Sequence, residues 1–339
     1  MNNVPEVFTI VASNQDVSKS SYDSYEKYKP VLWPQPKKID EKSTREDSLN
    51  EILSLRDRKK DCLIFVDDII FKQYLTNELI QEASNYDIWG GIMTQPKSEK
   101  VQNCGFRFVN IDNEISYRPL TEKEFKQQSC DFFTGCFMYI KKDYLNNIKN
   151  FPKQCYNRWE EIVFMENAKI LGAKVGIIDF KLSHYGNSTK KNKDLKLSSI
   201  SWLIERDLWN DVVKNYLQHL KPTLSLDTIV EDDLKSIIES ESKKIIYGAG
   251  MNTYKLLSKT RFKNIEIISG LKEEVGKEMK GSKIKEISEV NFESKKIIVT
   301  PIGYDKEILT LLKKYSDLEP LFLSLENSGN HSKLSIKKD

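Results

Sequence analysis

The stretch Cys62-Leu63-Ile64-Phe65-Val66-Asp67-Asp68 places two adjacent carboxylates directly after a short apolar run. A run of this length and composition is typical of a strand that is buried on both faces. Carboxylates at the end of such a strand are costly to desolvate unless they bind something. Because ligands gather at the carboxyl ends of strands in open α/β sheets, Asp67 and Asp68 are candidates for holding a divalent cation and a diphosphate. The dipeptide alone fits a turn or a helix cap equally well.

On both sides of this stretch, predicted strands alternate with predicted helices, which indicates a parallel sheet. Apolar runs predict strands over Val7–Ala12, Ile88–Met93 and Val175–Ile178. Apolar residues at helical spacing predict helices from Ser48, over Trp159–Leu171 with Gly172 as C-cap, and within residues 198–220. Residues 15–47 are polar and weakly patterned, and Pro30, Pro34 and Pro36 exclude a long helix there.

A second set of alternating elements follows residue 243. Lys244–Tyr247 is a predicted strand, Gly248-Ala249-Gly250 a turn and Thr253–Ser258 a helix. Further strands are predicted over Ile265–Ile268, Lys296–Thr300 and Leu321–Ser324, with a helix over Lys306–Tyr315. We therefore expect one domain over residues 1–221, a polar linker over residues 222–242, a smaller domain over residues 243–327 and a disordered tail over residues 328–339.

The composition excludes several classes of protein. The 339 residues carry 53 basic and 50 acidic side chains, and a net charge of +3 is too balanced for a typical nucleic-acid-binding protein. No apolar run approaches the roughly 18–20 residues of a membrane helix, and no secretory signal is visible. The five cysteines form no CxxC pair, which argues against a zinc site. We expect a cytoplasmic protein of two domains.

Three motifs follow the acidic pair. Asp131-Phe132-Phe133-Thr134-Gly135-Cys136 leads into an apolar segment that ends at Ile140, before two lysines. Trp159-Glu160-Glu161-Ile162 then opens a predicted helix, and a later strand ends at His184. The order and spacing of these motifs resemble the family-2 glycosyltransferases, and the resemblance covers about residues 7–190.

The resemblance implies an α/β fold, with a GT-A nucleotide-sugar-binding domain followed by a smaller Rossmann-like parallel-sheet domain. By position, Asp68 matches the family's metal- and diphosphate-binding carboxylate and His184 its metal-ligating histidine. Glu161 matches the catalytic general base, and Glu160 matches its acidic neighbour. The matches to substrate-binding positions are Asn14, Asp67, Thr134 and Gly135. The implied cofactor is a divalent cation, Mn²⁺ or Mg²⁺.

These residue types suit inverting glycosyl transfer, in which a carboxylate takes the proton of the acceptor hydroxyl and a cation neutralises the departing diphosphate. Taken alone, Glu160 and Glu161 are ordinary acidic residues of a first helical turn. Three features depart from the family pattern. The usual second strand, with its acidic motif for the nucleotide base, is shortened or absent, and Val66 stands where the metal motif often begins. Glutamate replaces aspartate at position 161, so the base assignment stays open between Glu160 and Glu161.

The turn Gly248-Ala249-Gly250 follows a predicted strand and opens a predicted helix, the context in which a dinucleotide-binding motif has meaning. Thr253 replaces the third glycine, and the next strand ends in Ser269-Gly270 without an acidic residue for a ribose hydroxyl. We assign Gly248 and Gly250 as cofactor-binding candidates. The segment resembles accessory Tyr-Gly-Ala-Gly domains attached to bacterial sugar-modifying enzymes.

The expected function is that of a metal-dependent, inverting glycosyltransferase of bacterial glycan biosynthesis. Its partners would be a nucleoside-diphosphate sugar as donor and a glycan or glycoprotein as acceptor; peripheral membrane contact and homo-oligomerisation stay open. A non-catalytic nucleotide-sugar- or glycan-binding module is the alternative, to which Val66 points. A nicotinamide-dependent oxidoreductase centred on the glycine turn is a third reading, which Thr253 disfavours.

Overall fold

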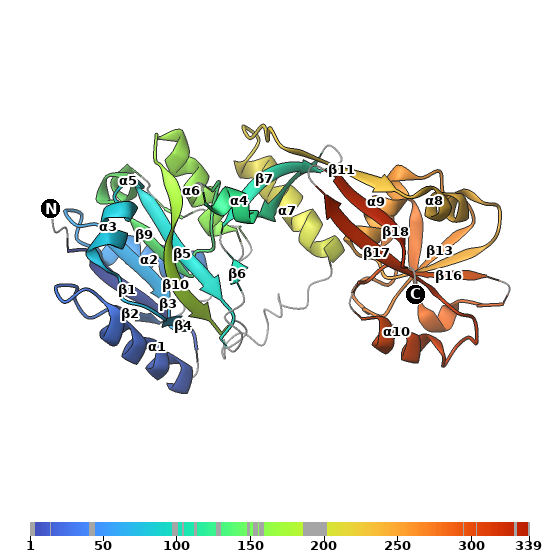
Figure 1. Cartoon of the computed structure of the whole chain (residues 1–339), viewed down its shortest axis with the longest axis horizontal. Coiled ribbons are helices and arrows are strands. Elements are labelled where there is room, and N and C mark those ends of the chain that lie inside the picture. The colour runs from blue at the N-terminus through green and yellow to red at the C-terminus, as the bar shows by residue number, and fades with distance from the viewer. Residues whose placement is uncertain are drawn as a thin grey trace. The chain divides into compact units, whose positions relative to one another are not determined.

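The computed structural model describes residues 4–13, 15–40, 45–96, 101–103, 105–111, 114–126, 130–147, 150–151, 155, 159–185, 202–293, 295–302, 304–328 and 331–337. The chain divides into two compact units (Figure 1). The first comprises residues 1–108, 117–198 and 212–220, and the second comprises residues 109–116, 199–211 and 221–339. The two sheets contain parallel strands and are accompanied by helices, so the predicted α/β class is confirmed.

The first unit holds a mixed sheet with both parallel and antiparallel strand pairs. Its strands are β1 (Glu6–Val11), β2 (Lys37–Asp40), β3 (Cys62–Val66), β4 (Ile69–Phe71), β5 (Ile88–Thr94), β6 (Val101–Asn103), β9 (Phe137–Ile140) and β10 (Val175–His184). They pair in the order β2-β1-β3-β9-β5-β10-β4, with β6 on β5. Strand β9 runs antiparallel to β3 and β5, and β4 runs antiparallel to β10. The helices are α1 (Gln15–Tyr28), α2 (Arg45–Leu55), α3 (Asn77–Ala83), α4 (Glu122–Phe125), α5 (Lys142–Asn147) and α6 (Glu160–Ile170).

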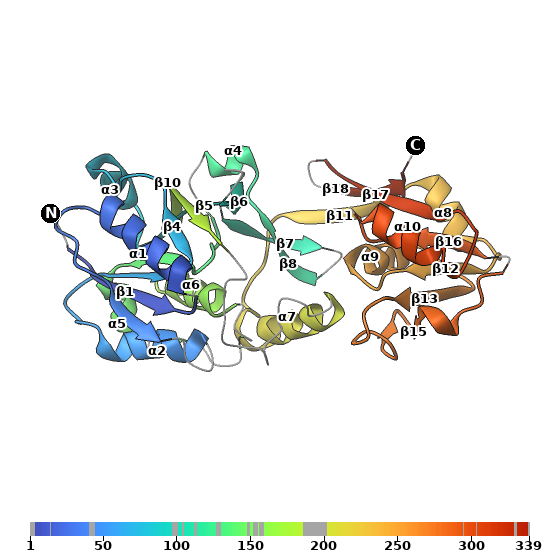
Figure 2. The ribbon, with the colours of Figure 1, turned by 90° about the horizontal axis from the view of Figure 1, so that it is seen from below.

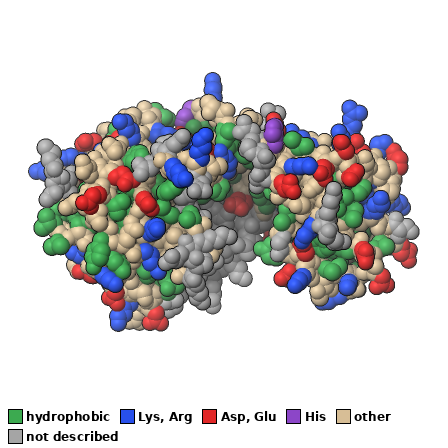
Figure 3. All heavy atoms as spheres, in the orientation of Figure 1, with side chains coloured by type: hydrophobic (Ala, Val, Ile, Leu, Met, Phe, Trp, Pro, Cys, Tyr) green, Lys and Arg blue, Asp and Glu red, His purple; other side chains and the backbone are tan. Residues whose placement is uncertain are grey.

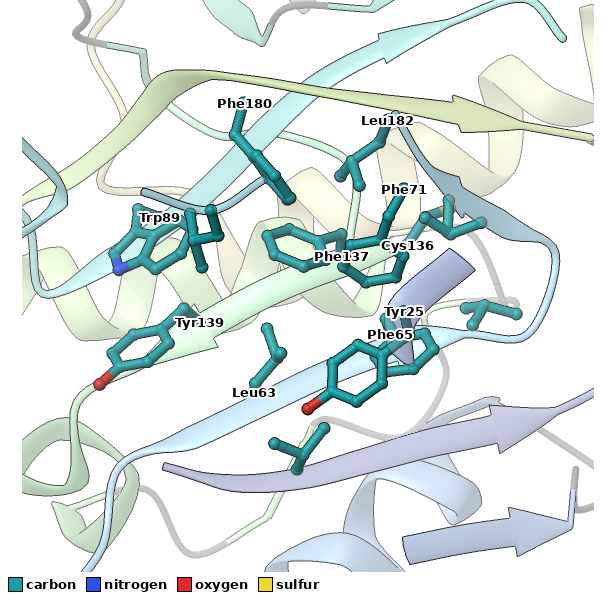
Figure 4. Close-up of a cluster of buried hydrophobic side chains, with 14 of the residues drawn as sticks. Tyr25, Leu63, Phe65, Phe71, Trp89, Cys136, Phe137, Tyr139, Phe180 and Leu182 are labelled. Atoms are coloured by element: carbon teal, nitrogen blue, oxygen red, sulfur yellow. The ribbon is translucent and has the colours of Figure 1, made fainter. Parts of the chain in front are cut away.

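The core of the first unit follows from the alternation of side chains along β3. Leu63 and Phe65 belong to a cluster on one face, where the ring of Phe65 stacks on Tyr25 of α1 with 5.4 Å between centroids (Figure 4). Ile64 is also fully buried and faces the other way, because successive strand residues point to opposite faces. Figure 2 shows α1 and α3 on one side of this sheet and α2, α5 and α6 on the other. Both faces of β3 are therefore covered, which explains its unbroken apolar run.

Helix α1 and strand β2 correct the expectation for residues 15–47. A 14-residue helix ends at Tyr28, so the prolines from Pro30 onward prevent only its continuation. Its buried residues are Ser21 and Tyr25, a stripe too narrow to give a clear apolar period. Strand β2 then pairs in parallel with β1, so the second strand that we expected to be shortened or absent is present, with four residues.

The second unit contains a larger sheet with a parallel centre. Its strands are β7 (Phe106–Ile111), β8 (Glu114–Pro119), β11 (Ser225–Val230), β12 (Lys244–Tyr247), β13 (Ile265–Ser269), β14 (Glu278–Met279), β15 (Ser282–Glu286), β16 (Lys296–Val299), β17 (Leu321–Ser328) and β18 (His331–Ile336), and the outer ends of β7 and β8 belong to the first unit. The strand order is β14-β15-β13-β12-β16-β17-β18-β11-β7-β8. Its helices are α8 (Asp232–Glu239), α9 (Met251–Lys259) and α10 (Asp305–Leu312), together with residues 202–211 of α7 (Trp202–Tyr216), whose last residues, 212–216, belong to the first unit.

Strand β12 separates two cores in the second unit. Ile246 packs with residues of α8 and α9 on one face, among them Leu234 and Leu256. Ile245 packs on the other face with residues of α10, among them Ile308. The chain continues from β12 through α9 to β13 on one side and later adds β16 on the other side of β12. The strand order therefore reverses between β12 and β16, and such switch points are where open α/β sheets bind ligands.

Two boundary expectations differ from the structure. Residues 222–242, expected to be a polar linker, contain β11 and α8, because Leu234 and Ile238 lie four residues apart and form a buried stripe on α8. Residues 328–339, expected to be a disordered tail, contain β18, which pairs antiparallel with β17 and parallel with β11. Leu334 of β18 is completely buried. No helix in the described ranges is both long enough and apolar enough to cross a membrane.

Candidate active site

The candidate residues of the first unit converge because of strand direction. Strands β1, β3, β5 and β10 run the same way, so their carboxyl ends lie at one edge of the sheet. Strand β9 runs in the opposite direction and pairs Phe137 with Phe65, so Gly135 and Cys136, which precede β9, reach the same edge. This carboxyl edge is where ligands bind in sheets of this kind.

The side chain of Asp67 binds the backbone of the loop that follows β1. Its Oδ1 accepts hydrogen bonds from the backbone N–H groups of Ala12 at 3.0 Å and Ser13 at 2.9 Å. Its own N–H donates to the carbonyl of Ile10 at 3.1 Å. The side chain is completely buried, so Asp67 fixes the backbone of the loop that follows β1 and does not itself reach the surface. Asn14, the next residue of that loop, lies outside the described residues.

Asp68 and His184 meet although they are far apart in the sequence. Strand β4 follows Asp68 immediately and pairs antiparallel with the end of β10, with Ile69 opposite His184. The backbone N–H of Tyr185 also donates to the carbonyl of Asp68 at 3.1 Å. These pairings place Nε2 of His184 3.2 Å from Oδ2 of Asp68. The structure therefore brings together the two residues that the sequence predicts as metal ligands.

Asp68 and His184 are at the distance of a directly hydrogen-bonded ion pair, and the same spacing would also suit two ligands of one cation. Two adjacent ligands of an octahedral ion, each at about 2.1 Å, lie roughly 3.0 Å apart, close to the observed 3.2 Å between Oδ2 and Nε2. Within the described ranges, no group of three or more His, Cys, Asp or Glu side chains is arranged to hold a metal ion.

Cys136 is a neighbour that the sequence analysis missed. Its Sγ lies 3.7 Å from Nε2 of His184, the same ring nitrogen that faces Asp68. A nucleophilic relay needs one ring nitrogen for the nucleophile and the other for the carboxylate, so this trio is not a cysteine-protease-like triad. Cys136 and then Asp68 raise the pKa of His184 to about 11 against the effect of burial. Burial raises the pKa of Cys136, but His184 and Arg45 outweigh it and the net pKa is lowered.

Glu160 and Glu161 open α6 beside Gly135. The backbone N–H of Gly135 donates to Oε1 of Glu161 at 3.3 Å. A Cβ on Gly135 would lie 3.0 Å from Cβ of Glu161 and 3.1 Å from Nη2 of Arg45, so a larger residue there would require these neighbours to move. Thr134, which precedes Gly135, is half-buried. The Thr-Gly segment and the head of α6 are thus packed against each other.

The two glutamates have different surroundings. Glu160 is completely buried, and its Oε1 lies 3.1 Å from Nε of Arg45. Burial, then the charge of Glu161, raises the pKa of Glu160 well above its ordinary value, and Arg45 only partly opposes the shift. Glu161 retains 8% exposure, and its Oε2 has no hydrogen-bond partner among the described residues. Both oxygens of Glu160 also lack a hydrogen-bond partner among the described residues. The two glutamates therefore differ in exposure: Glu160 has none, and Glu161 keeps a small exposed fraction although its Oε2 atom is itself buried.

Arg45 and Asp40 are further residues that sequence reasoning missed. Arg45 begins α2 and reaches Glu160. Asp40 ends β2 opposite Val11, which places an exposed carboxylate at the carboxyl edge of the sheet. The only sequence signal for β2 is Ile39 among charged residues after three prolines. The second strand, which we expected to be shortened or absent, is thus a four-residue strand with an acidic residue at its end.

The glycine turn of the second unit has one constrained glycine and one open glycine. Gly248 has φ 102°, and a Cβ there would meet the Pro301 ring at 2.7 Å. Gly250 is the N-cap of α9, and a Cβ there would have nothing within 4 Å. Thr253, which replaces the third glycine, is buried, and its hydroxyl donates to the carbonyl of Gly248 at 2.5 Å. The hydrogen bond from Thr253 thus stabilises the turn, and free space remains beside Gly250.

This contrast gives a matched pair of substitutions. We expect Gly248→Ala to lower the free energy of unfolding by about 2–4 kcal/mol, because it combines a strained φ with a clash against a proline ring. Gly250→Ala should change it by less than about 0.5 kcal/mol. Urea unfolding of both variants measures the difference. Equal effects of the two substitutions would contradict this description of the turn.

The chain was also compared with known proteins. No protein-family model and no curated protein sequence matches it. Similar solved structures include GalNAc-T7 with UDP, GalNAc and Mn²⁺, at 10% identity and TM-score 0.48, over 64% of this chain and 50% of that chain. A197 from STIV matches at 13% identity and TM-score 0.33, over 55% of this chain and 87% of that one. The inositol-1-phosphate CTP transferase from T. maritima matches at 11% identity and TM-score 0.29, over 62% and 77%.

This chain thus spans about half the length of GalNAc-T7. TM-scores below 0.5 at these identities assign no function. The fold class rests on the pairing of the chain's own strands, and the function has to be argued from its own site.

Proposed function

We propose that the first unit is a metal-dependent, inverting glycosyltransferase that uses a nucleoside-diphosphate sugar. The observation that carries the proposal is the meeting of Asp68 and His184, 3.2 Å apart, at the carboxyl edge of the sheet. A second acidic group, Glu161, reaches the same edge through Gly135. One site thus combines a pair of cation ligands with a separate carboxylate that can take a proton.

Each residue has a defined task in this proposal. Asp68 and His184 would hold Mn²⁺ or Mg²⁺, which when bound would supply positive charge to the departing diphosphate. Asp67 fixes the β1 exit loop, and Asp40 faces the nucleoside from the end of β2. Glu161 accepts the proton of the acceptor hydroxyl while the hydroxyl oxygen bonds to the anomeric carbon and the bond from that carbon to the diphosphate breaks. The acceptor is a glycan or a protein-linked sugar.

The position of Arg45 supports different roles for the two glutamates. The Nε atom of Arg45 lies 3.1 Å from Oε1 of Glu160, and Glu160 is completely buried, so this carboxyl group faces Arg45 and not a substrate. Glu161 keeps 8% exposure in the first turn of α6, where the helix dipole favours a negative charge. This supports Glu161 as the base.

A non-catalytic nucleotide-sugar-binding module is the second candidate, and Val66 favours it. The position before the acidic pair carries a buried valine and not a third carboxylate. Such a module would bind the nucleotide without needing a cation. For the second unit, we infer that the Gly248–Gly250 turn contacts a ligand at the switch point between β12 and β16, which is supported by the free space beside Gly250.

The dependence of nucleotide binding on a cation tests the proposal. Calorimetry with UDP and GDP, with and without Mn²⁺, should show binding that Mn²⁺ strengthens. Asp68→Ala should weaken the Mn²⁺-dependent binding by at least about 100-fold, since it removes one of two protein ligands. Asp179→Asn, an exposed carboxylate on β10, should leave it unchanged. Equal binding with and without Mn²⁺ would favour the non-catalytic module, and unchanged binding by Asp68→Ala would remove Asp68 from the site.

A further inference from the structure

Tyr185 presents an aromatic side chain next to the two proposed cation ligands. It follows His184 directly, and its backbone N–H donates to the carbonyl of Asp68 at 3.1 Å. Tyr185 is nevertheless 45% exposed. None of the described residues forms a hydrogen bond with its hydroxyl group or packs a ring or a cation against its ring. The backbone of Tyr185 is thus tied to the candidate active site while its ring stays uncovered.

Exposure alone does not distinguish Tyr185 from other apolar residues. Figure 3 shows hydrophobic side chains scattered among charged ones over the visible face of the chain, and single exposed apolar residues are normal. Tyr74 is even more exposed, at 59%, but it follows β4, which runs antiparallel to β10 and therefore leads to the opposite edge of the sheet. Its ring also packs against Tyr28, with 5.1 Å between centroids. Tyr185 differs because it lies at the carboxyl edge, where ligands bind.

The strand end that carries Tyr185 is held from both sides. Ser183 of β10 pairs with Thr94 of β5, and the two hydroxyl oxygens lie 3.0 Å apart. On the other side of β10, His184 pairs with Ile69 of β4. A side chain at the end of a paired strand is positioned more precisely than one on a free loop. Tyr185 can therefore present its ring to a substrate at a fixed place.

The strand order indicates which part of a donor Tyr185 would meet. In the proposed function, Asp40 at the end of β2 faces the nucleoside, and Asp68 and His184 bind the cation on the diphosphate. Strand β2 stands at one end of the strand order, and β10 is next to the other end. A donor that extends from Asp40 to the cation would therefore carry its sugar on the β10 side, where Tyr185 follows.

We propose that the ring of Tyr185 packs against the donor sugar, a hexopyranose, and is a specificity-determining contact for the donor. This assignment rests on the proposed function. A pyranose has an apolar face of C–H groups, and an aromatic ring offers a flat apolar surface whose electronegative face suits them. The contact needs the ring of Tyr185 and not its hydroxyl group. It also needs no charge, so it would recognise the shape of the sugar.

Calorimetry with the full chain and Mn²⁺ tests this contact by comparing a free nucleoside diphosphate with its sugar derivatives. The probes are UDP, UDP-glucose, UDP-galactose and UDP-N-acetylglucosamine, together with GDP and GDP-mannose. Y185A should weaken binding of the sugar nucleotide that the wild type binds most tightly by about 3–10-fold, the usual effect of one aromatic contact. Its affinity for the matching free diphosphate should change by less than about twofold. Y185F, which keeps the ring, and the control Y74A, which removes an exposed tyrosine elsewhere, should bind both like the wild type.

Three results would overturn the assignment of Tyr185 alone. Equal weakening of the free diphosphate and the sugar nucleotide in Y185A would show that Tyr185 supports the nucleotide or the cation ligands. Unchanged binding of the sugar nucleotide by Y185A, or binding by Y185F that is as weak as in Y185A, would exclude ring packing on the sugar. A wild type that binds no nucleotide at all would overturn the proposed function together with this contact. Circular dichroism melts of all variants separate loss of fold from loss of contact.

Discussion

Replacing Glu161 with glutamine is expected to slow sugar transfer by on the order of 10²–10⁴-fold while nucleotide binding stays unchanged. Glutamine keeps the shape of the side chain, so its amide oxygen can still accept the N–H of Gly135, as Oε1 of Glu161 does at 3.3 Å. The substitution removes only the basicity of the second oxygen, which has no hydrogen-bond partner among the described residues. Single-turnover transfer from a nucleoside-diphosphate sugar, together with calorimetric donor affinity, separates the two effects.

Glu160→Gln is the matched control for this experiment. Glu160 is completely buried against Arg45, so its replacement should alter stability more than transfer. If Glu160→Gln is inactive and Glu161→Gln transfers at the wild-type rate, the two roles are reversed. If neither substitution slows transfer, the proposed base mechanism is wrong.

Arg45→Met is expected to lower the free energy of unfolding by about 3–5 kcal/mol, the usual effect of removing one partner of a buried ion pair. Its side chain is 22% exposed and that of Glu160 is not exposed at all. The variant would leave Glu160 beside Glu161 without a compensating cation. Urea unfolding at several pH values measures the loss.

The loss should depend on pH in a defined direction. The pKa of Glu160 is already raised by burial and by Glu161, and removal of Arg45 raises it further. A carboxyl group with a raised folded-state pKa stabilises the fold below its unfolded pKa, and that contribution is lost as the pH rises through the folded value. The destabilisation by Arg45→Met should therefore be smaller in acid than at neutral pH. A loss that is independent of pH would contradict the ion pair as its cause.

Two further variants isolate this ion pair. Arg45→Met combined with Glu160→Gln should recover part of the lost stability, because the unpaired carboxylate is gone. Lys263→Met breaks an exposed pair with Glu241, whose side chains are 55% and 75% exposed, and should cost no more than about 1 kcal/mol. If Lys263→Met were as damaging as Arg45→Met, burial would not be the deciding factor.

The parts of the fold that were predictable are those with an apolar signature of their own. Strand β3 is buried on both faces and α6 buries most of its length, so both appear in the sequence as continuous apolar patterns. Helix α1 buries only Ser21 and Tyr25, and β18 places buried serines beside Leu334. Those elements depend on partners far along the chain, and local patterning does not reveal them.

The candidate site shows the same division. Asp68, Glu161 and His184 each end a strand or begin a helix that the sequence predicts, so their convergence at one edge could be anticipated from topology. The contacts of Arg45 and Cys136 could not be anticipated, because the sequence around each residue does not indicate which distant residue it will contact. Arg45 reaches Glu160 only when α2 and α6 are in place, and Cys136 meets His184 only through β9 and β10.

The division into units has a consequence for the modular history of this chain. Residues 109–116 and 199–211 belong to the second unit, although residues of the first unit stand before, between and after them. No single pair of breakpoints can therefore excise either unit whole. A cut after residue 221 would keep every segment of the first unit. It would also leave residues 110–111 of β7 without their pairing partners in β11, which begin at Ser225. Recombination could exchange the glycine-turn region of this chain as a cassette only by carrying the β7–β8 tip with it.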